Sequence, residues 1–271
     1  MPTVSDQYAL LNGLRFHYRE WGDAGARPLL LLHGLTGHAR FWDTFAKGMA
    51  GSHRVIALDA RGHGESQWAD DYSPPAMARD VGLLVAALGL QRLSVVGLSM
   101  GGTTAYHYAL DRPSALERLV IVDIAPEVAA VGGQRIRGGM EAATLFDSVD
   151  DLVAHGHRIN PNADRAEVEH RFRNNALLLE DGRWTFRHDV RGLLARERGD
   201  PAVLWAALPR IAVPTLLVRG GTSDVLDPAA AARVVGTIPG CKFVEIPATG
   251  HSVPMENPAG FLEAVRAFLE A

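Results

Sequence analysis

A serine flanked by glycines is the stretch of the sequence best suited to covalent chemistry. Ser99 lies in Gly97-Leu98-Ser99-Met100-Gly101, directly after the apolar run 93–96. A β-branched strand that turns into a helix at a single serine is typical of the G-x-S-x-G nucleophile elbow. We expect Ser99 to have a strained backbone with positive φ, because side chains at 97 and 101 would collide across so tight a turn. The hydroxyl would then project from the end of a strand.

Such a serine needs a general base, and the base needs a partner that fixes its tautomer. Of the eleven histidines, His251 follows Gly250 in the loop after the last predicted strand, 242–246. Other histidines lie in glycine-rich turns or in a middle stretch without strands, namely His33, His63, His155, His157 and His188. We therefore predict that His251 is the base.

The negative charge formed when a serine attacks a carbonyl requires two hydrogen-bond donors. Met100 follows Ser99 at the start of a predicted helix, whose positively polarised end favours an anion. His33-Gly34-Leu35 follows the buried apolar run 28–32, so its backbone can approach a ligand at the end of another strand. We predict an oxyanion hole formed by the amides of Leu35 and Met100.

These residues must be positioned by a parallel sheet. Asn12-Gly13 predicts a hairpin turn between strands 8–11 and 14–18, and apolar runs predict further strands at 28–32, 54–58, 93–96, 116–122, 214–219 and 242–246. Predicted helices alternate with them, at 41–49, after Pro74 to 88, 100–110, from Pro228, and 258–269. This alternation indicates an α/β fold with right-handed crossovers. We interpret the polar loop 59–66 as a scaffold rather than as part of the chemistry.

The alternation stops between residues 127 and 208. This stretch has no β-branched apolar run, and its polar segments 150–156 and 164–179 read as helices. Ligands of α/β sheets bind outside the carboxyl ends of the strands. We therefore predict a core in two parts, 1–126 and 209–271, with a helical lid, 127–208, inserted between them.

Composition excludes several classes of protein. The chain has 271 residues, a formal net charge of −4 and a single cysteine, Cys241. These values argue against a nucleic-acid partner, an internal disulfide and a cysteine-rich metal site. The first residues resemble no secretory leader, and no apolar run approaches the roughly 18 residues that span a bilayer. We expect a cytoplasmic enzyme, monomeric or homodimeric, that needs no metal or cofactor and has no membrane partner.

At this point the sequence resembles the serine-nucleophile branch of the α/β-hydrolase superfamily. The resemblance covers nearly the whole chain outside 127–208 and is carried, in order, by His33-Gly34, Asp59-x-Arg61-Gly62-His63-Gly64-x-Ser66, Gly97-x-Ser99-x-Gly101-Gly102 and Gly250-His251. It implies an eight-stranded, mostly parallel sheet flanked by helices, a Ser-acid-His triad and a lid after the sixth strand. Val122-Asp123-Ile124-Ala125-Pro126 and Arg219-Gly220-x-x-Ser223 resemble, more narrowly, small esterases and enzymes that hydrolyse acetamidomethylene succinate.

Two aspartates compete for the acid of the triad. Most relatives place it after the seventh strand, and Gly221-Thr222-Ser223-Asp224 fits that pattern. If Val225-Leu226 is matched to the hydrophobic pair that usually follows, however, Ser223 takes the place of the acid. The narrower subgroup uses an aspartate after the sixth strand, where Asp123 lies. Both loops could reach the imidazole; we favour Asp123 and keep Asp224 as the alternative.

The predicted reaction is two-step acyl transfer on a small-molecule carboxylic ester. An amide, a vinylogous diketone cleaved at a C–C bond or an enol-lactone would suit the same residues, and a receptor with a silent triad is a remote alternative. By position, the pocket walls are expected to be His33, Gly34, Leu35, Phe41, Trp42, Met100, Trp184 and Leu226. An arginine near Trp184, such as Arg187, could hold a substrate carboxylate.

Overall fold

Eight strands form one sheet in the computed structural model, which describes residues 4–111, 113–142 and 144–271. The spatial order is β1-β2-β4-β3-β5-β6-β9-β10. The pairs β1–β2 and β2–β4 are antiparallel, and the other neighbours are parallel, which confirms the predicted mostly parallel sheet. The strands are β1 (Val4–Leu11), β2 (Leu14–Trp21), β3 (Arg27–Leu32), β4 (His53–Leu58), β5 (Leu93–Leu98), β6 (Leu116–Val122), β9 (Thr215–Gly220) and β10 (Lys242–Ile246).

Alternate side chains of the central strands build two separate cores. Leu30 and Leu32 of β3 belong to one buried cluster, whereas Leu29 and Leu31 belong to the other. The first cluster contains the apolar sides of α2 (Pro74–Ala87), α3 (Met100–Leu110), α8 (Pro201–Ala207) and α9 (Pro228–Thr237). The second contains those of α1 (Asp43–Met49) and α11 (Pro258–Glu270). Strands buried on both faces explain the continuous apolar run of β3.

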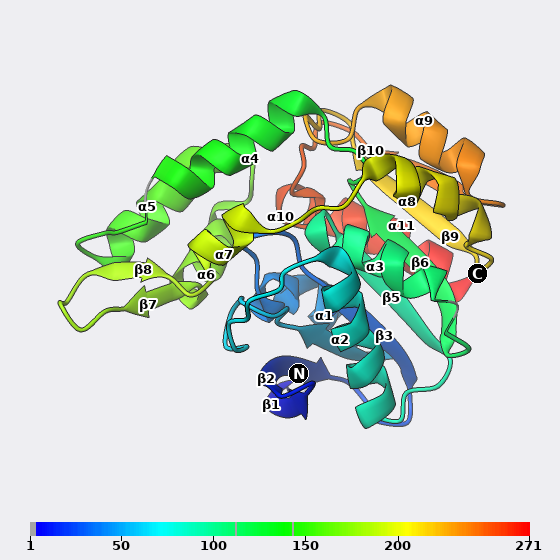
Figure 1. Cartoon of the computed structure of the whole chain (residues 1–271), viewed down its shortest axis with the longest axis horizontal. Coiled ribbons are helices and arrows are strands. Elements are labelled where there is room, and N and C mark those ends of the chain that lie inside the picture. Colours follow the sequence, from blue (N-terminus) through cyan, green and yellow to red (C-terminus); the bar gives the residue numbers. More distant parts are fainter. Residues whose placement is uncertain (1–3, 112, 143) are drawn as a thin grey trace.

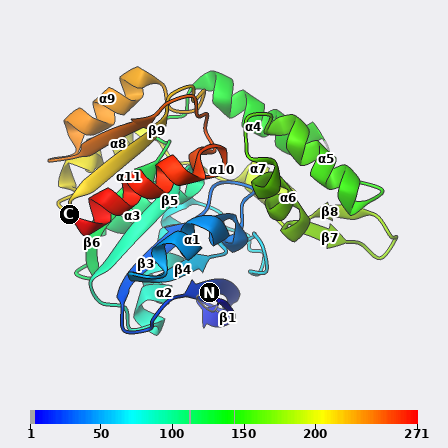
Figure 2. The same cartoon turned by 180° about the vertical axis from the view of Figure 1, so that it is seen from behind.

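The helices therefore cover the sheet in two layers. Figure 1 shows α2, α3 and α8 on the near side, and Figure 2, from behind, shows α1 and α11 in front of the strands. The short helices η1 (Ala39–Trp42), η2 (Leu208–Arg210) and α10 (Val253–Glu256) lie in connections. Within the ranges given above, no helix combines the length and apolar character needed to cross a bilayer.

The long insertion between β6 and β9 is not wholly helical. It contains α4 (Ala130–Ala142), α5 (Val149–Ile159), α6 (Arg165–Asn174) and α7 (Val190–Ala195), but also an antiparallel hairpin of β7 (Ala176–Leu178) and β8 (Trp184–Phe186). The predicted helical segment 164–179 thus ends at Asn174. Figure 1 shows α4 to α7 as a layer beside the sheet, with the hairpin farthest from it. Leu204 and Trp205 of α8, placed by the sequence in 127–208, pack instead in a core cluster of the sheet.

The polar loop after β4 is a scaffold, as expected. The buried carboxylate of Asp59 accepts hydrogen bonds from the amides of Ala39 and Glu65 and pairs with His17 at 2.7 Å. Arg61 forms a bidentate ion pair with Asp80, at 2.6 and 2.7 Å. These bonds fix the loop that supports the ends of β3 and β4.

Candidate active site

The turn at Ser99 has the strained backbone predicted from its glycines. Ser99 has φ 52° and ψ −115° and caps α3. A Cβ atom at Gly101 would lie 2.2 Å from the carbonyl oxygen of Leu32, and one at Gly97 would lie 2.3 Å from that of Gly101. The amide of Ser99 donates to the carbonyl of Val122 at 3.0 Å, which ties the turn to the end of β6. Packing and hydrogen bonding thus hold a conformation that a non-glycine residue rarely adopts.

Asp123 supplies the carboxylate next to His251. Nδ1 of His251 lies 2.8 Å from Oδ2 of Asp123, and Asp123 is completely buried. The amide of Gly220 donates to the other carboxylate oxygen at 2.9 Å, and the hydroxyl of Ser223 donates to Oδ2. Asp123 itself has φ 53°, which turns its side chain from the end of β6 toward β9. A buried carboxylate with three donors is satisfied as an anion.

Asp224, the alternative acid, does not contact His251. Its two oxygens accept from Arg135 of α4 at 2.6 and 2.8 Å, and this pairing lowers the pKa of Asp224. Ser223 stands where the acid of most relatives was expected, and its hydroxyl points to Asp123 while accepting from the amides of Val225 and Leu226. The loop after β9 therefore presents a serine to the buried carboxylate and turns its aspartate toward the insertion.

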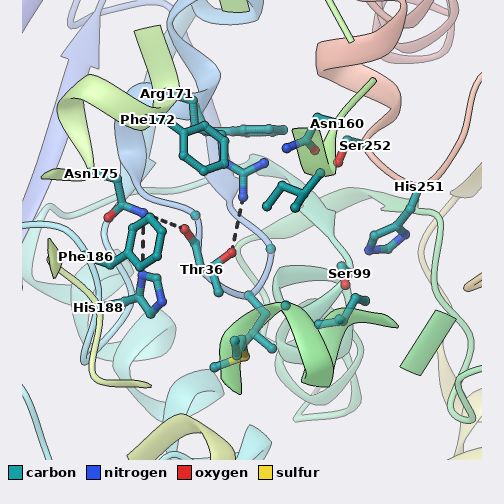
Figure 3. Close-up of a pocket in the computed structure, with 18 of the residues that line it drawn as sticks. Thr36, Ser99, Asn160, Arg171, Phe172, Asn175, Phe186, His188, His251 and Ser252 are labelled. Atoms are coloured by element: carbon teal, nitrogen blue, oxygen red, sulfur yellow. Dashed lines mark hydrogen bonds between the residues drawn. The ribbon is translucent and has the colours of Figure 1, made fainter. Parts of the chain in front are cut away.

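Ser99 and His251 open into one cavity of about 410 Å³ (Figure 3). No hydrogen bond joins the two side chains within the described part of the chain. In resting hydrolases this contact is often long and shortens only when substrate binds. The cavity is lined by the core and by the insertion, with α4, α5, α6 and β8 contributing its far wall.

The predicted oxyanion donors flank this cavity. Leu35 lines it directly, and Met100 is the first residue of α3, next to Ser99. In the regions that the structure describes, the Leu35 amide donates to no protein acceptor. Thr36 follows with φ 63°, so the backbone turns sharply after Leu35. An amide without a protein partner at this position is available to a ligand.

The other predicted pocket residues divide into two groups. Gly34 and Phe41 line the cavity with Leu35, whereas the remaining five do not, namely His33, Trp42, Met100, Trp184 and Leu226. Trp42 packs against Phe45 in the core, and Leu226 is fully buried in the opposite core. The side chain of Met100 belongs to a small buried cluster with Tyr72 and Met77, and Trp184 pairs in the β7–β8 hairpin.

His33 has a structural role instead. Its Nδ1 lies 2.8 Å from the carbonyl oxygen of Gly34, and its Nε2 accepts from the Ala60 amide at 3.0 Å. Burial lowers the pKa of His33, so the ring stays neutral and keeps both bonds. It shapes the loop that carries Leu35 without entering the cavity.

Sequence reasoning missed the polar lining that the insertion contributes. The cavity contains Arg158, Asn160, Arg171, Asn175 and His188. Burial and the nearby Arg171 lower the pKa of His188 to about 3, so this ring is neutral. Arg187, the arginine singled out in the sequence, is not among the lining residues; its carbonyl accepts from the indole of Trp68. No sequence signal distinguishes Arg171 from the other arginines, because its position depends on how α6 packs over the loop after β3.

The described residues include no cluster of His, Cys, Asp or Glu side chains that could hold a metal ion. Ser99, His251 and Leu35 line the same cavity.

Comparisons with known proteins agree with the fold. A family model described as the alpha/beta hydrolase fold matches residues 27–258. A 3-hydroxybutyrate-oligomer hydrolase of Cupriavidus necator is 30% identical over 95% of this chain and 94% of its own length. An esterase of Mycobacterium tuberculosis, Rv0045c, is 31% identical over 92% of this chain and 85% of its own. The solved structure of E-2-(acetamidomethylene)succinate hydrolase superposes with a TM-score of 0.89 at 22% identity, over 99% of this chain and 100% of the other, which shows a shared fold.

Proposed function

The chain belongs to the α/β-hydrolase family, and on that basis we propose that it is a serine hydrolase that cleaves a carboxylic ester of a small molecule. The observation that carries the proposal is the hydrogen bond between the buried carboxylate of Asp123 and His251, beside the strained Ser99 in a common cavity. Relatives named as an esterase and as a 3-hydroxybutyrate-oligomer hydrolase support the choice of an ester.

In the proposed first step, Oγ of Ser99 attacks the carbonyl carbon while Nε2 of His251 takes the hydroxyl proton. The resulting oxyanion receives hydrogen bonds from the amides of Leu35 and Met100. When the tetrahedral intermediate collapses, the bond to the alcohol oxygen breaks and His251 returns the proton to that oxygen. The alcohol leaves, and the acyl group remains on Ser99 as an ester.

In the second step, a water molecule takes the place of the alcohol. His251 removes its proton as it attacks the acyl carbon, and the proton then passes to Oγ of Ser99. The carboxylic acid is released and the serine is restored. Asp123 holds the Nδ1 proton of His251 throughout, which keeps Nε2 free to accept and stabilises the imidazolium.

The insertion, residues 127–208, is proposed to act as the lid of this site. Its helices α4 to α6 supply one wall of the cavity, and Arg135 of α4 is tied to Asp224 of the core. A wall built on a separate insertion can exclude water from the acyl-enzyme and select the substrate.

Pre-steady-state hydrolysis of p-nitrophenyl acetate and butyrate tests the proposed function. The wild-type protein should release a burst of p-nitrophenol equal to the concentration of active sites, followed by slower turnover. Ser99→Ala should lose the burst and reduce kcat by about 10⁴-fold or more. Ser94→Ala, on the same strand β5, is the matched control and should retain both. Equal turnover by the wild-type and Ser99→Ala proteins would contradict the proposed function.

A further inference from the structure

Of the three arginines that line the cavity, only Arg135 forms an ion pair among the described residues, and Arg171 is a buried one that does not. Arg171 is carried by α6 and lies across the cavity from Ser99 (Figure 3). Its guanidinium donates to the hydroxyl of Thr36 at 3.3 Å. Its Nε is sealed from solvent and has no hydrogen-bond partner. Across the described ranges of the chain, no carboxylate lies within ion-pairing distance of Arg171.

Aromatic rings take the place of a carboxylate partner. The guanidinium carbon lies 5.4 Å from the ring centre of Phe41 and 5.4 Å from that of Phe172. Such rings attract a cation and keep it rigid, but they accept no hydrogen bond in the plane of the guanidinium. The planar donor edge of Arg171 is therefore held in place and left largely unsatisfied.

The other charged side chains that line the cavity are also positive. Arg135, Arg158 and Arg171 line it, and no aspartate or glutamate appears among the lining residues. Of the three arginines, Arg135 is neutralised by Asp224. His188 is neutral for the reason given above. The side chains that line the cavity therefore carry a net positive charge.

Arg171 keeps its charge at neutral pH. Burial lowers the pKa of Arg171 to about 10, which is still well above 7. A buried cation without a counter-ion is unfavourable, and Arg171 does not lose its proton at pH 7. A ligand that brings an anion into the cavity would supply the missing partner.

We propose that Arg171 binds a carboxylate group of the substrate, so that the natural ester carries a free acid in addition to the bond that is cleaved. This inference rests on the proposed function, whose site it shares. Thr36, which contacts the guanidinium, follows Leu35, a proposed oxyanion donor. Arg171 and Ser99 line the same cavity, so a half-ester of a dicarboxylic acid can present its carboxylate to one and its ester carbonyl to the other.

A purely structural role for the side chain is the competing explanation. Other groups, however, already join α6 and its C-terminal end to the core. Nε2 of His38 donates to the main-chain carbonyl of Arg171 at 2.9 Å, and the side-chain amide of Asn175 donates to the carbonyl of Thr36 at 3.0 Å. Neither hydrogen bond involves the guanidinium, so α6 is attached to the core without the positive charge of Arg171.

Two pairs of p-nitrophenyl esters test the assignment. Mono-p-nitrophenyl succinate and glutarate carry a carboxylate, and their methyl esters have nearly the same shape without the charge. The wild-type protein should show a higher kcat/KM for the charged ester of at least one pair. Arg171→Met should reduce kcat/KM for that ester by about 10- to 100-fold, mainly through KM, and leave its neutral partner within about 3-fold. Arg187→Met, an arginine outside the cavity, is the control and should keep the preference.

Equal kcat/KM for the charged and neutral esters of both pairs would overturn the proposal, as would an Arg171→Met variant that loses both activities equally. If Arg171→Met does not fold, inhibition of the wild-type protein decides. Glutarate should inhibit more strongly than glutaramide, and equal inhibition would contradict a carboxylate site. If no ester is hydrolysed at all, the proposed function fails instead, and calorimetric binding of glutarate to the wild-type and Arg171→Met proteins still tests the anion site separately.

Discussion

Two strained residues at the ends of neighbouring strands bring the proposed triad together. Ser99 and Asp123 follow β5 and β6 directly, and both have φ near +50°. Each is held by its own amide: Ser99 donates to the carbonyl of Val122, and Asp123 donates to that of Val218 at 2.8 Å. The strained conformations turn both side chains off the sheet toward His251. Strain at these positions is therefore part of how the site is assembled.

At the level of single residues, Asp123 and Asp224 should respond very differently to loss of charge. Asp123→Asn should lower kcat for p-nitrophenyl butyrate by about 10³- to 10⁴-fold, because an amide no longer fixes the His251 tautomer or stabilises the imidazolium. The kcat of Asp224→Asn should stay within about 5-fold of the wild-type value, since Asp224 pairs only with Arg135. Steady-state rates of the two purified variants measure this difference. A large loss in Asp224→Asn and none in Asp123→Asn would contradict the assignment.

Some of these residues could be predicted from the sequence, and others could not. Ser99 and His251 each lie in a short motif whose backbone requirements are local, so their positions follow from neighbouring glycines. The choice between Asp123 and Asp224 stays open in the sequence, because the direction of Asp123 depends on its backbone angle and that of Asp224 on its pairing with Arg135. Arg171 was missed because its place in the cavity depends on long-range packing of α6.

At the level of elements, glycines matter where another backbone approaches closely. Gly101 faces the carbonyl of Leu32 at a distance that admits no Cβ, whereas Gly138 of α4 is exposed and has open space around it. Gly101→Ala should lower the free energy of unfolding by about 1–3 kcal/mol or more. Gly138→Ala should raise it by about 0.5–1 kcal/mol, because alanine favours a helix. Urea unfolding followed by circular dichroism measures both changes.

The Gly101→Ala and Gly138→Ala variants also test the turn at Ser99 independently of catalysis. A Gly101→Ala protein as stable as the wild type would mean that the turn has room the structure does not show. Since α4 contains four glycines in Ala130–Ala142, its helix propensity is low, and Gly138→Ala offers a simple way to stiffen that part of the insertion.

The strands of the sheet were easier to predict than the insertion. The run Leu29–Leu32 is apolar at every position because both faces are buried, and Asn12-Gly13 adopts positive φ at both residues as a hairpin turn requires. In the insertion, β7 and β8 have three residues each, and the sequence Ala-Leu-Leu of β7 fits a helix as well as a strand. Only pairing between the two segments decides their conformation.

At the level of the whole molecule, buried histidines should make stability depend on pH. Burial lowers the pKa of His38 to about 4 and that of His188 to about 3, and it lowers the pKa of His33 and His63 as well. The unfolded chain, in which a histidine has a pKa of about 6.5, binds protons that the folded chain excludes. The stability of the fold therefore falls as the pH drops from about 6.5 toward 4.

The hydrogen-bonded pair His17 and Asp59 changes this dependence of stability on pH, Asp59 at low pH and His17 near neutral pH. Burial opposes the charge on Asp59, but its hydrogen bond with His17 lowers its pKa to about 2, so its contribution is present above pH 3.8 and lost as the pH falls toward 2. Burial opposes the charge on His17, but the hydrogen bonds to Asp59 and Asp6 and the nearby negative charges together raise its pKa. The contribution of His17 is therefore present below about pH 6.5 and lost as the pH rises. This one histidine with a raised pKa offsets only part of the effect of the histidines whose pKa is lowered.

Thermal unfolding at constant ionic strength should therefore give a lower midpoint at pH 4.5 than at pH 7. His38→Gln keeps a donor for the carbonyl of Arg171 but removes one titrating group, so its midpoint should change less between the two values. An unfolding midpoint that is equal or higher at pH 4.5 would show that these rings are not neutral in the folded protein.

The central claim is that Ser99 is a nucleophile activated by His251. Mass spectrometry after treatment with a fluorophosphonate measures this most directly. We predict a single stoichiometric adduct on the peptide that contains Ser99, greatly slowed in His251→Ala and absent in Ser99→Ala. An unlabelled wild-type protein, or an adduct on another residue that persists in Ser99→Ala, would contradict the account.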